Sequence, residues 1–436
     1  MFKQLLTPVG DSLPFSFLVA ALPILTVLLV LGVLRRPAWQ ASLGGLAVGL
    51  ATATMVWKLP VTLALSSVAN GAVFALWPVM WIVLAALLVY NIAVASGRFD
   101  AFRSWLLTNV PNDRRIVLIV IGFCFGALLE GVAGFGTPVA ITGSLLILVG
   151  FPPIEALVMV LIFDTAPVAF GALGAPVTVL GSVTGLPTHA LAAMIGRQLP
   201  VMAAILPFYV MALYGGWRSI RALWPVLLVA GLSFAAGQFA ASNYIDYTLT
   251  DVLASLVSLI ATLAFLRVWR PPPDPAFAIQ DEAALEARPV GAPPAWQGWL
   301  PWAIISATVV LWTTFKVANI GQQNIHWPAL DKAISITLYH DKPYAAVWTF
   351  QPLATGTAIL LAAILTAVAV RLSPVAFFGC AAQTVRQAWK AVVTVMLIVG
   401  LAYLMNYSGL AYTLGLGAAS TGHAFVLLSP FLGWVA

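Results

Sequence analysis

Apolar segments long enough to cross a lipid bilayer recur along this chain of 436 residues, and no other feature constrains its fold as strongly. Segments of about 20 residues, the length at which a helix spans roughly 30 Å of hydrocarbon, follow one another from residue 13 onward. The mean hydropathy is +1.01, and only 8% of the residues are charged. Because lipid offers the backbone no hydrogen-bond partner, these segments must be helices. We predict an all-α polytopic membrane protein with about 11–13 transmembrane or re-entrant helical segments.

Two halves of inverted topology are expected, and polar stretches give their boundaries. Residues 271–299 begin with PPPDP and are too polar and proline-rich for lipid, which predicts a linker. The expected parts are a first transmembrane half at 1–215 with broken helices at 130–138 and 164–176, connecting transmembrane helices at 216–270, a linker at 271–299, and a partial second transmembrane half at 300–436. Fewer residues follow Asn406 than separate Glu130 from Tyr214. We therefore expect the second half to be truncated.

Basic residues gather between the apolar runs, and by the positive-inside rule they predict the orientation of the chain. The loops expected in the cytoplasm contain Arg35, Arg36, Arg98, Arg103, Arg114, Arg115, Arg218, Arg221, the linker, Arg371, Arg386 and Lys390. The N-terminus, the turn at 243–251 and the polar stretch at 319–350 are then outside. No cleavage pattern follows the first apolar run, so we expect it to remain. The net charge of +6 is explained by the basic residues in these loops, which set the topology. We therefore expect no nucleic-acid partner.

Two of the 14 acidic residues, Glu130 and Asp164, lie within apolar runs, and the others fall in loops or near the ends of spans. An ionisable group at membrane depth costs at least about 2.5 kcal/mol to insert and usually faces a cavity or an ion pathway. Gly122, Gly126, Glu130 and Gly134 are spaced four apart, so a helix places this acid on a stripe of small residues. We predict that Glu130 and Asp164 are proton-coupling residues. The alternative is that each only joins two helices by a hydrogen bond.

Glycine and proline interrupt the chain after each of these acids. In GVAGFGTP the glycines allow a break, and Thr137-Pro138 can start a new helix whose free N–H groups attract an anion. GALGAPV follows Asp164 and repeats the pattern, although chance is the alternative for so short a repeat. The predicted substrate-binding residues at these breaks are Gly134, Phe135, Gly136, Thr137 and Gly174.

Three further polar residues lie in apolar surroundings. Arg197, in MIGRQLP, can bind a substrate carboxylate through its two-pronged guanidinium, or its side chain can reach from a helix end to the membrane interface. Asn406 and Ser408 interrupt a later apolar run and offer uncharged groups for a substrate hydroxyl, with helix–helix hydrogen bonds as the alternative. We include all three in the predicted substrate site.

The motifs of most enzyme classes are missing from the sequence. It contains no nucleotide-binding glycine loop, no zinc spacing and no nucleophile elbow, and its four histidines are too scattered to pair as haem ligands. Cys124 and Cys380 lie among apolar residues, which is typical of buried packing. We predict no enzyme activity, no cofactor and no metal.

Several long motifs, in order, carry a family resemblance. GALLEGVAGFGTPVAI, TAPVAFGALGAPV, MIGRQLP, GWRSIRALWPVLLVAGLSFA and MNYSG with SPFLGW resemble the bacterial L-lactate permease family. The resemblance runs from about residue 120 to the last residue and implies import of L-lactate, D-lactate or glycolate with protons. The family pattern more often has Asn at the position of Asp164. Family members also continue beyond SPFLGW into a polar motif, which agrees with a truncated chain.

The resemblance and the residues together predict a mechanism. Glu130 takes up a proton from outside, while the Thr137 helix start and Arg197 hold the carboxylate of a small monocarboxylate. Asn406 and Ser408 contact its hydroxyl from the opposing half, and rocking of the halves alternates access. We expect a multi-pass protein of the bacterial inner membrane, and the sequence leaves the oligomeric state open. The alternatives are a transporter of another organic anion with the same fold, or a membrane subunit of an oxidoreductase.

Overall fold

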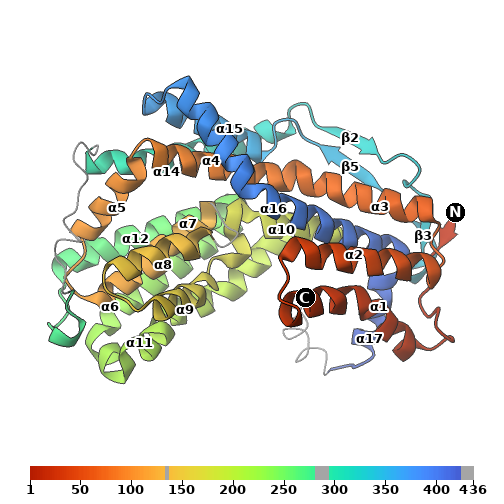
Figure 1. Cartoon of the computed structure of the whole chain (residues 1–436), viewed down its shortest axis with the longest axis horizontal. Helices are drawn as coiled ribbons and strands as arrows, with labels where there is room; N and C mark the ends of the chain where they lie inside the picture. The colour runs from red at the N-terminus through yellow and green to blue at the C-terminus, as the bar shows by residue number, and fades with distance from the viewer. Residues whose placement is uncertain (133–136, 280–293, 424–436) are drawn as a thin grey trace. The chain divides into compact units, whose positions relative to one another are not determined.

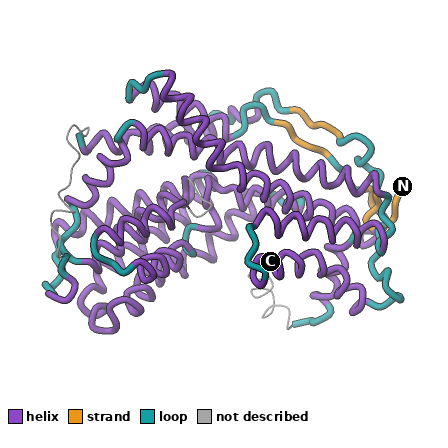
Figure 2. Tube along the Cα trace, in the orientation of Figure 1, coloured by secondary structure: helices purple, strands orange, loops and turns teal. Residues whose placement is uncertain are grey.

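The computed structural model describes residues 1–132, 137–279 and 294–423. The chain divides into two compact units that alternate along the sequence. The first unit comprises residues 1–80, 321–351 and 387–436, and the second comprises residues 81–320 and 352–386. Helices make up most of the described chain, as Figure 1 and Figure 2 show.

The first unit is built around the pair of helices α1 and α2, with α17 packed on α1. Its helical elements are α1 (Leu13–Leu28), η1 (Leu29–Val33), α2 (Ala38–Met55), α3 (Val61–Phe74), η2 (Ala75–Met80), the part of α16 (Pro374–Ser408) from residue 387 onward, and α17 (Leu410–Ala419). Its strands are β1 (Phe2–Lys3), β2 (Gln323–His326), β3 (Ile334–Ile336), β4 (Lys342–Pro343) and β5 (Val347–Phe350), and a short helix η10 (Thr337–Tyr339) lies among them.

The strands modify the all-α prediction. The 319–350 stretch, expected as a polar loop, forms a three-stranded sheet in the order β1-β3-β4 and a β2-β5 hairpin. Strand β3 is fully buried and pairs in parallel with β1 at the N-terminus. Charged residues of both signs in this stretch made strands hard to predict. Its short runs ISI and VWTF nevertheless contain β-branched and aromatic residues, which favour strands.

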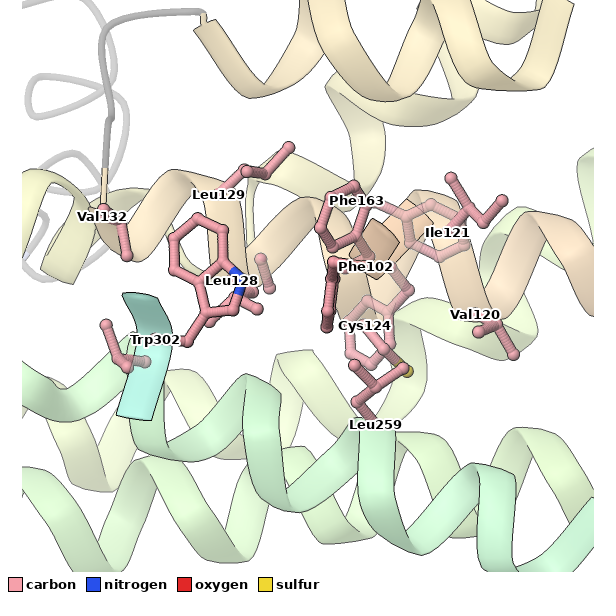
Figure 3. Close-up of a cluster of buried hydrophobic side chains, with 14 of the residues drawn as sticks. Phe102, Val120, Ile121, Cys124, Leu128, Leu129, Val132, Phe163, Leu259 and Trp302 are labelled. Atoms are coloured by element: carbon pink, nitrogen blue, oxygen red, sulfur yellow. The ribbon is translucent and has the colours of Figure 1, made fainter. Parts of the chain in front are cut away.

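The second unit holds the two interrupted regions and the largest apolar core. Its α-helices are α4 (Trp81–Ala95), α5 (Arg98–Thr108), α6 (Arg114–Val117), α7 (Gly126–Val132), α8 (Thr137–Leu148), α9 (Pro153–Asp164), α10 (Gly171–Thr184), α11 (Thr188–Ala240), α12 (Thr250–Val268), α14 (Leu300–Thr314), α15 (Thr355–Ala369) and the part of α16 before residue 387. Shorter or π-type helices are η3 (Leu118–Phe125), η4 (Val168–Phe170), η5 (Ala241–Ile245), η6 (Tyr247–Leu249), η7 (Pro275–Phe277), η8 (Ala295–Trp299) and η9 (Val317–Asn319). Figure 3 shows part of this core, where Leu128 and Leu129 lie among side chains that include Leu259 and Trp302.

Six helices of the described chain are long and apolar enough to cross a membrane, and a bent pair raises the number to seven. The protein is therefore a multi-pass helical membrane protein, as predicted. The number of 11–13 transmembrane or re-entrant segments stays a prediction, because one element assigned as a single helix can contain a turn and so more than one segment. Helix α11 illustrates this: Gly216 (φ 65°, ψ −173°) breaks it, and Gly231 packs against the backbone of Ala204. One continuous element is thus a helical hairpin.

The start of the expected linker is docked on this unit through a buried arginine. Arg115, treated above as a loop charge, is 1% exposed. Its guanidinium forms an ion pair with Asp113 at 2.7 Å, lies 3.7 Å from Asp274, and stacks over the Phe277 ring. Residues 274–277 of the linker are therefore held against the helix that leads to the interrupted region.

Candidate functional site

Glu130 and Asp164 meet inside the second unit. Glu130 lies in α7, two residues before its last residue, and Asp164 is the last residue of α9. Their carboxyl groups lie close enough to interact with each other, and Glu130 is only 4% exposed. Two ionised carboxylates repel each other at such a range, and a hydrogen bond between two carboxyl groups requires a proton, because an ionised carboxylate has no hydrogen to donate. The two acids, 34 positions apart in the sequence, therefore form one pair of interacting acids.

Small residues let the surrounding helices approach this pair closely. A Cβ atom added to Gly122 would lie 3.1 Å from the Phe163 ring, next to Asp164, and one added to Gly171 would overlap Glu130 Oε1. Of the predicted stripe of small residues, Gly122 faces α9 and Gly126 faces Thr142 of α8, as close-packing positions should. A side chain at Gly171 would force the Glu130 carboxyl group to move from its present position.

A third carboxylate, Asp251, completes the cluster. It lies in the first turn of α12, is 0% exposed, and repels both Glu130 and Asp164 electrostatically. Helix α12 packs along α7 at Gly131, where an added Cβ would lie 2.8 Å from Asp251 Cβ (Figure 1). The sequence predicts Asp251 at the end of an exterior turn, because an acid in the first turn of a helix is ordinarily explained by the helix dipole. Only the tertiary contact with Gly131 reveals its position.

The chain bends sharply after Asp164. Helices α9 and η4–α10 are bent by 66°, and Ala172, Leu173 and Gly174 take left-handed conformations with φ between 46° and 73°. Each left-handed non-glycine residue costs roughly 1–2 kcal/mol, so the packing around it must maintain this shape. Tyr247 supplies part of that packing: its ring would touch a Cβ at Gly174, and its hydroxyl lies 3.1 Å from Thr178 Oγ1.

Comparison with known proteins decides the family. The sequence profile described as L-lactate permease matches residues 16–436. The chain belongs to the L-lactate permease family. Its relatives include an L-lactate permease of Escherichia coli (strain K12), 41% identical, and a glycolate permease of the same strain, 38% identical; each alignment covers 100% of this chain and 82% of the relative. An L-lactate permease of Bacillus subtilis (strain 168) is 36% identical, again over the whole chain. No solved structure matches.

The permease is therefore a transporter and not an enzyme, which removes the oxidoreductase-subunit alternative. Within its described residues, no group of three or more His, Cys, Asp or Glu side chains could hold a metal ion. Among the described residues, the charged groups that act on Glu130 and on Asp251 are other acids of this cluster.

The predicted substrate residues of the permease are only partly located. Helix α8 begins at Thr137, the expected restart, and Gly174 lies at the second break. Gly134, Phe135 and Gly136 lie outside the described residues. Arg197 is exposed, and its Nε donates a hydrogen bond to Asn243 Oδ1 at 3.0 Å. This contact links α11 to η5, the segment that precedes Asp251 in the chain. The rest of the Arg197 guanidinium is exposed.

Asn406 and Ser408 lie in the first unit of the permease, at a third break. Gly409 (φ 100°) separates α16 from α17, and the Gln4 side chain donates hydrogen bonds to the backbone carbonyls of Asn406 and Tyr407. The Ser408 hydroxyl bonds the Met405 carbonyl and accepts from the Leu410 amide. The predicted interruption at NYSG is therefore present, and part of its polar backbone is satisfied by the N-terminal segment.

Proposed function

We propose that this permease imports 2-hydroxymonocarboxylates, namely L-lactate, D-lactate and glycolate, by proton symport across the bacterial inner membrane. The names of its relatives, L-lactate permease and glycolate permease, support the substrate class. One observation supports the coupling: Glu130 and Asp164, two interacting acids, lie together within candidate membrane spans. Intramembrane carboxyls that bind and release a proton are a common coupling device of transporters.

The proposed cycle begins on the outer side of the membrane, the side on which the positive-inside rule predicts the N-terminus. The Glu130–Asp164 pair takes up a proton, and the site then accepts a substrate anion without collecting excess negative charge. The helix start at Thr137 provides amide N–H groups for the carboxylate, and Arg197 provides a second donor. Release of both to the cytoplasm resets the pair.

The remaining substrate contacts belong to the same proposal. Gly134, Phe135, Gly136 and Gly174 are expected to let the backbone approach the anion, as glycine-rich breaks do in other transporters. Asn406 and Ser408 are candidates for the substrate hydroxyl, because Asn406 lies at a helix break that interrupts regular backbone pairing.

Counterflow in proteoliposomes tests the substrate class. Vesicles loaded with unlabelled L-lactate should accumulate labelled L-lactate transiently, and external D-lactate and glycolate should compete. Competition by a dicarboxylate or a sulfonate, with none by glycolate, would favour the alternative of a different organic anion. A single candidate arginine for the carboxylate favours one negative charge on the substrate over two.

Glu130→Gln tests the coupling role. The amide keeps the size of the side chain but cannot bind and release a proton at neutral pH. We expect counterflow to persist while accumulation driven by an imposed pH gradient is lost. Gradient-driven accumulation equal to that of the wild type would remove Glu130 from the proposed cycle.

A further inference from the structure

The N-terminal segment of the permease is bonded to the break between α16 and α17 in the same unit. The segment begins with β1, which pairs with the buried strand β3, and ends at the NYSG interruption. The Gln4 backbone amide donates to the Ser335 carbonyl at 3.2 Å, and the Gln4 carbonyl accepts from the Thr337 hydroxyl at 2.6 Å. Two residues further on, the Leu6 carbonyl accepts from the Thr413 hydroxyl of α17 at 2.8 Å. The segment therefore ties the three-stranded sheet to the helix break.

The side chain of Gln4 reaches the end of α16. Gln4 is 2% exposed, and its Nε2 donates to the carbonyl of Asn406 at 2.8 Å and to that of Tyr407 at 3.0 Å. The last four carbonyls of a helix have no partner within it, so these two bonds replace helical hydrogen bonds that cannot form at the break. Both contacted atoms are acceptors, so the amide nitrogen must face them, and its two hydrogens are both used.

The oxygen of the same amide shows that this orientation is maintained at a cost. Gln4 Oε1 is buried and has no hydrogen-bond partner among the described residues. A buried acceptor without a donor destabilises the folded state. Turning the amide over would place Oε1 against two carbonyl oxygens and would lose both bonds. The geometry therefore favours the two contacts with α16 over a partner for the amide oxygen.

Gly409 allows the N-terminal segment to approach the break. It takes φ 100°, a conformation open mainly to glycine, and it separates α16 from α17. A Cβ at this position would lie 3.0 Å from Leu5 O and 3.2 Å from Gln4 Cβ, so the segment packs directly on the break. The turn that carries Asn406 is thus fixed from outside its own helix, by a residue 402 positions away.

We propose that Gln4 is a positioning residue for the recognition of the substrate hydroxyl. By holding the carbonyls of Asn406 and Tyr407, it fixes the turn from which Asn406 and Ser408 are expected to contact that hydroxyl. Gln4 acts through this turn and does not itself touch the substrate. The effect on recognition rests on the proposed function, whereas the positioning of the turn by Gln4 does not.

Hydrogen–deuterium exchange of the reconstituted permease tests the positioning. Gln4→Met keeps a long side chain but removes both donors. Lys3→Met is the matched control, because Lys3 is the preceding residue and its exposed side chain pairs with Asp341 instead of α16. We expect the amides of residues 405–413 to exchange about tenfold faster in Gln4→Met, as the net loss of one hydrogen bond implies, and at the wild-type rate in Lys3→Met. Equal exchange of this stretch in the two variants would overturn the proposal.

Counterflow with L-lactate and propionate gives a readout that a merely structural role would not change. Propionate has the carboxylate of lactate without the hydroxyl, so the ratio of the two apparent affinities isolates the hydroxyl contact. We expect Gln4→Met to lower this ratio about tenfold and to leave the apparent affinity for propionate unchanged. A wild-type ratio in Gln4→Met would overturn the role in recognition. A wild type that does not discriminate between the two anions would instead refute the proposed hydroxyl contact, and it would leave the exchange result unchanged.

A second variant keeps the test decisive if Gln4→Met does not fold. Gln4→Asn retains the amide, but its side chain is one methylene shorter and cannot reach both carbonyls from the same backbone position. We expect faster exchange of residues 405–413 and a lower affinity ratio in this variant too. Wild-type values of both quantities would overturn the proposal.

Discussion

Gly131→Ala is the perturbation that best probes how α7 and α12 bring their carboxylates together. The new Cβ would lie 2.8 Å from Asp251 Cβ and 3.0 Å from the backbone nitrogen of Val252. Carbon atoms pack favourably at about 3.5–4.0 Å, so the two helices must separate by roughly 1 Å. Because both neighbouring atoms are rigid, a side-chain rotation cannot relieve the contact.

The expected free-energy change is the balance of two effects. Overpacking of a buried contact costs about 1–3 kcal/mol. Replacing glycine by alanine inside a helix stabilises it by up to about 1 kcal/mol, and by less at Gly131, one residue from the end of α7. Gly131→Ala should therefore lower the free energy of unfolding by about 1–2 kcal/mol and move Asp251 away from Glu130.

Gly126→Ala on the same helix is the matched control. Its Cβ would meet Ile121 O and Thr142 Cγ2 at 3.6 Å, an ordinary contact, so stability should stay equal or rise. Thermal unfolding of both purified variants, followed by tryptophan fluorescence, gives the comparison, and pH-driven uptake gives the functional readout. If Gly131→Ala is as stable and as active as Gly126→Ala, the close approach of α7 and α12 is wrong.

Three further perturbations have defined outcomes. Arg115→Leu leaves Asp113 buried without its partner and should destabilise the protein by about 3–5 kcal/mol, whereas Arg114→Leu, the control, should cost far less in the same unfolding assay. Gly171→Ala should displace the Glu130 carboxyl and reduce pH-driven accumulation with little change in thermal stability, because a flexible side chain can move; unchanged accumulation would contradict the contact. Hydrogen bonds from the Ala346 amide and His326 lower the pKa of Asp331 in the folded protein. The ionised Asp331 therefore stabilises the 319–350 segment above about pH 4, and this stabilisation is lost as the pH falls through the lowered pKa. Limited proteolysis of that segment should accelerate in this acid range for the wild type and show no such step in Asp331→Asn.

Several features of the site follow from sequence alone, because they are local. The break in GALGAPV, the helix start at Thr137 and the interruption at NYSG all follow from glycine and proline chemistry. The presence of Glu130 and Asp164 within apolar runs identified both as unusual, although not as partners of each other. Pairing depends on the packing of α7 against α9, which no short motif specifies.

The features that sequence analysis missed depend on contacts between distant segments. Asp251 has the position of an ordinary helix-start acid, and Arg115 that of an ordinary loop charge, yet both are buried. Strand β1 pairs with β3 across more than 300 residues, so its two residues give no local signal. The alternation of two compact units along the chain has the same origin, since 1–80 and 387–436 share one unit.

Proton movement during substrate entry tests the central claim most directly. Proteoliposomes loaded with a pH-sensitive dye, at equal pH on both sides and without sodium, receive external L-lactate. We predict internal acidification that exceeds that of protein-free vesicles and is abolished in Glu130→Gln. Uptake of labelled lactate by the wild type without acidification, or only when sodium is added, would contradict proton coupling through this carboxylate pair.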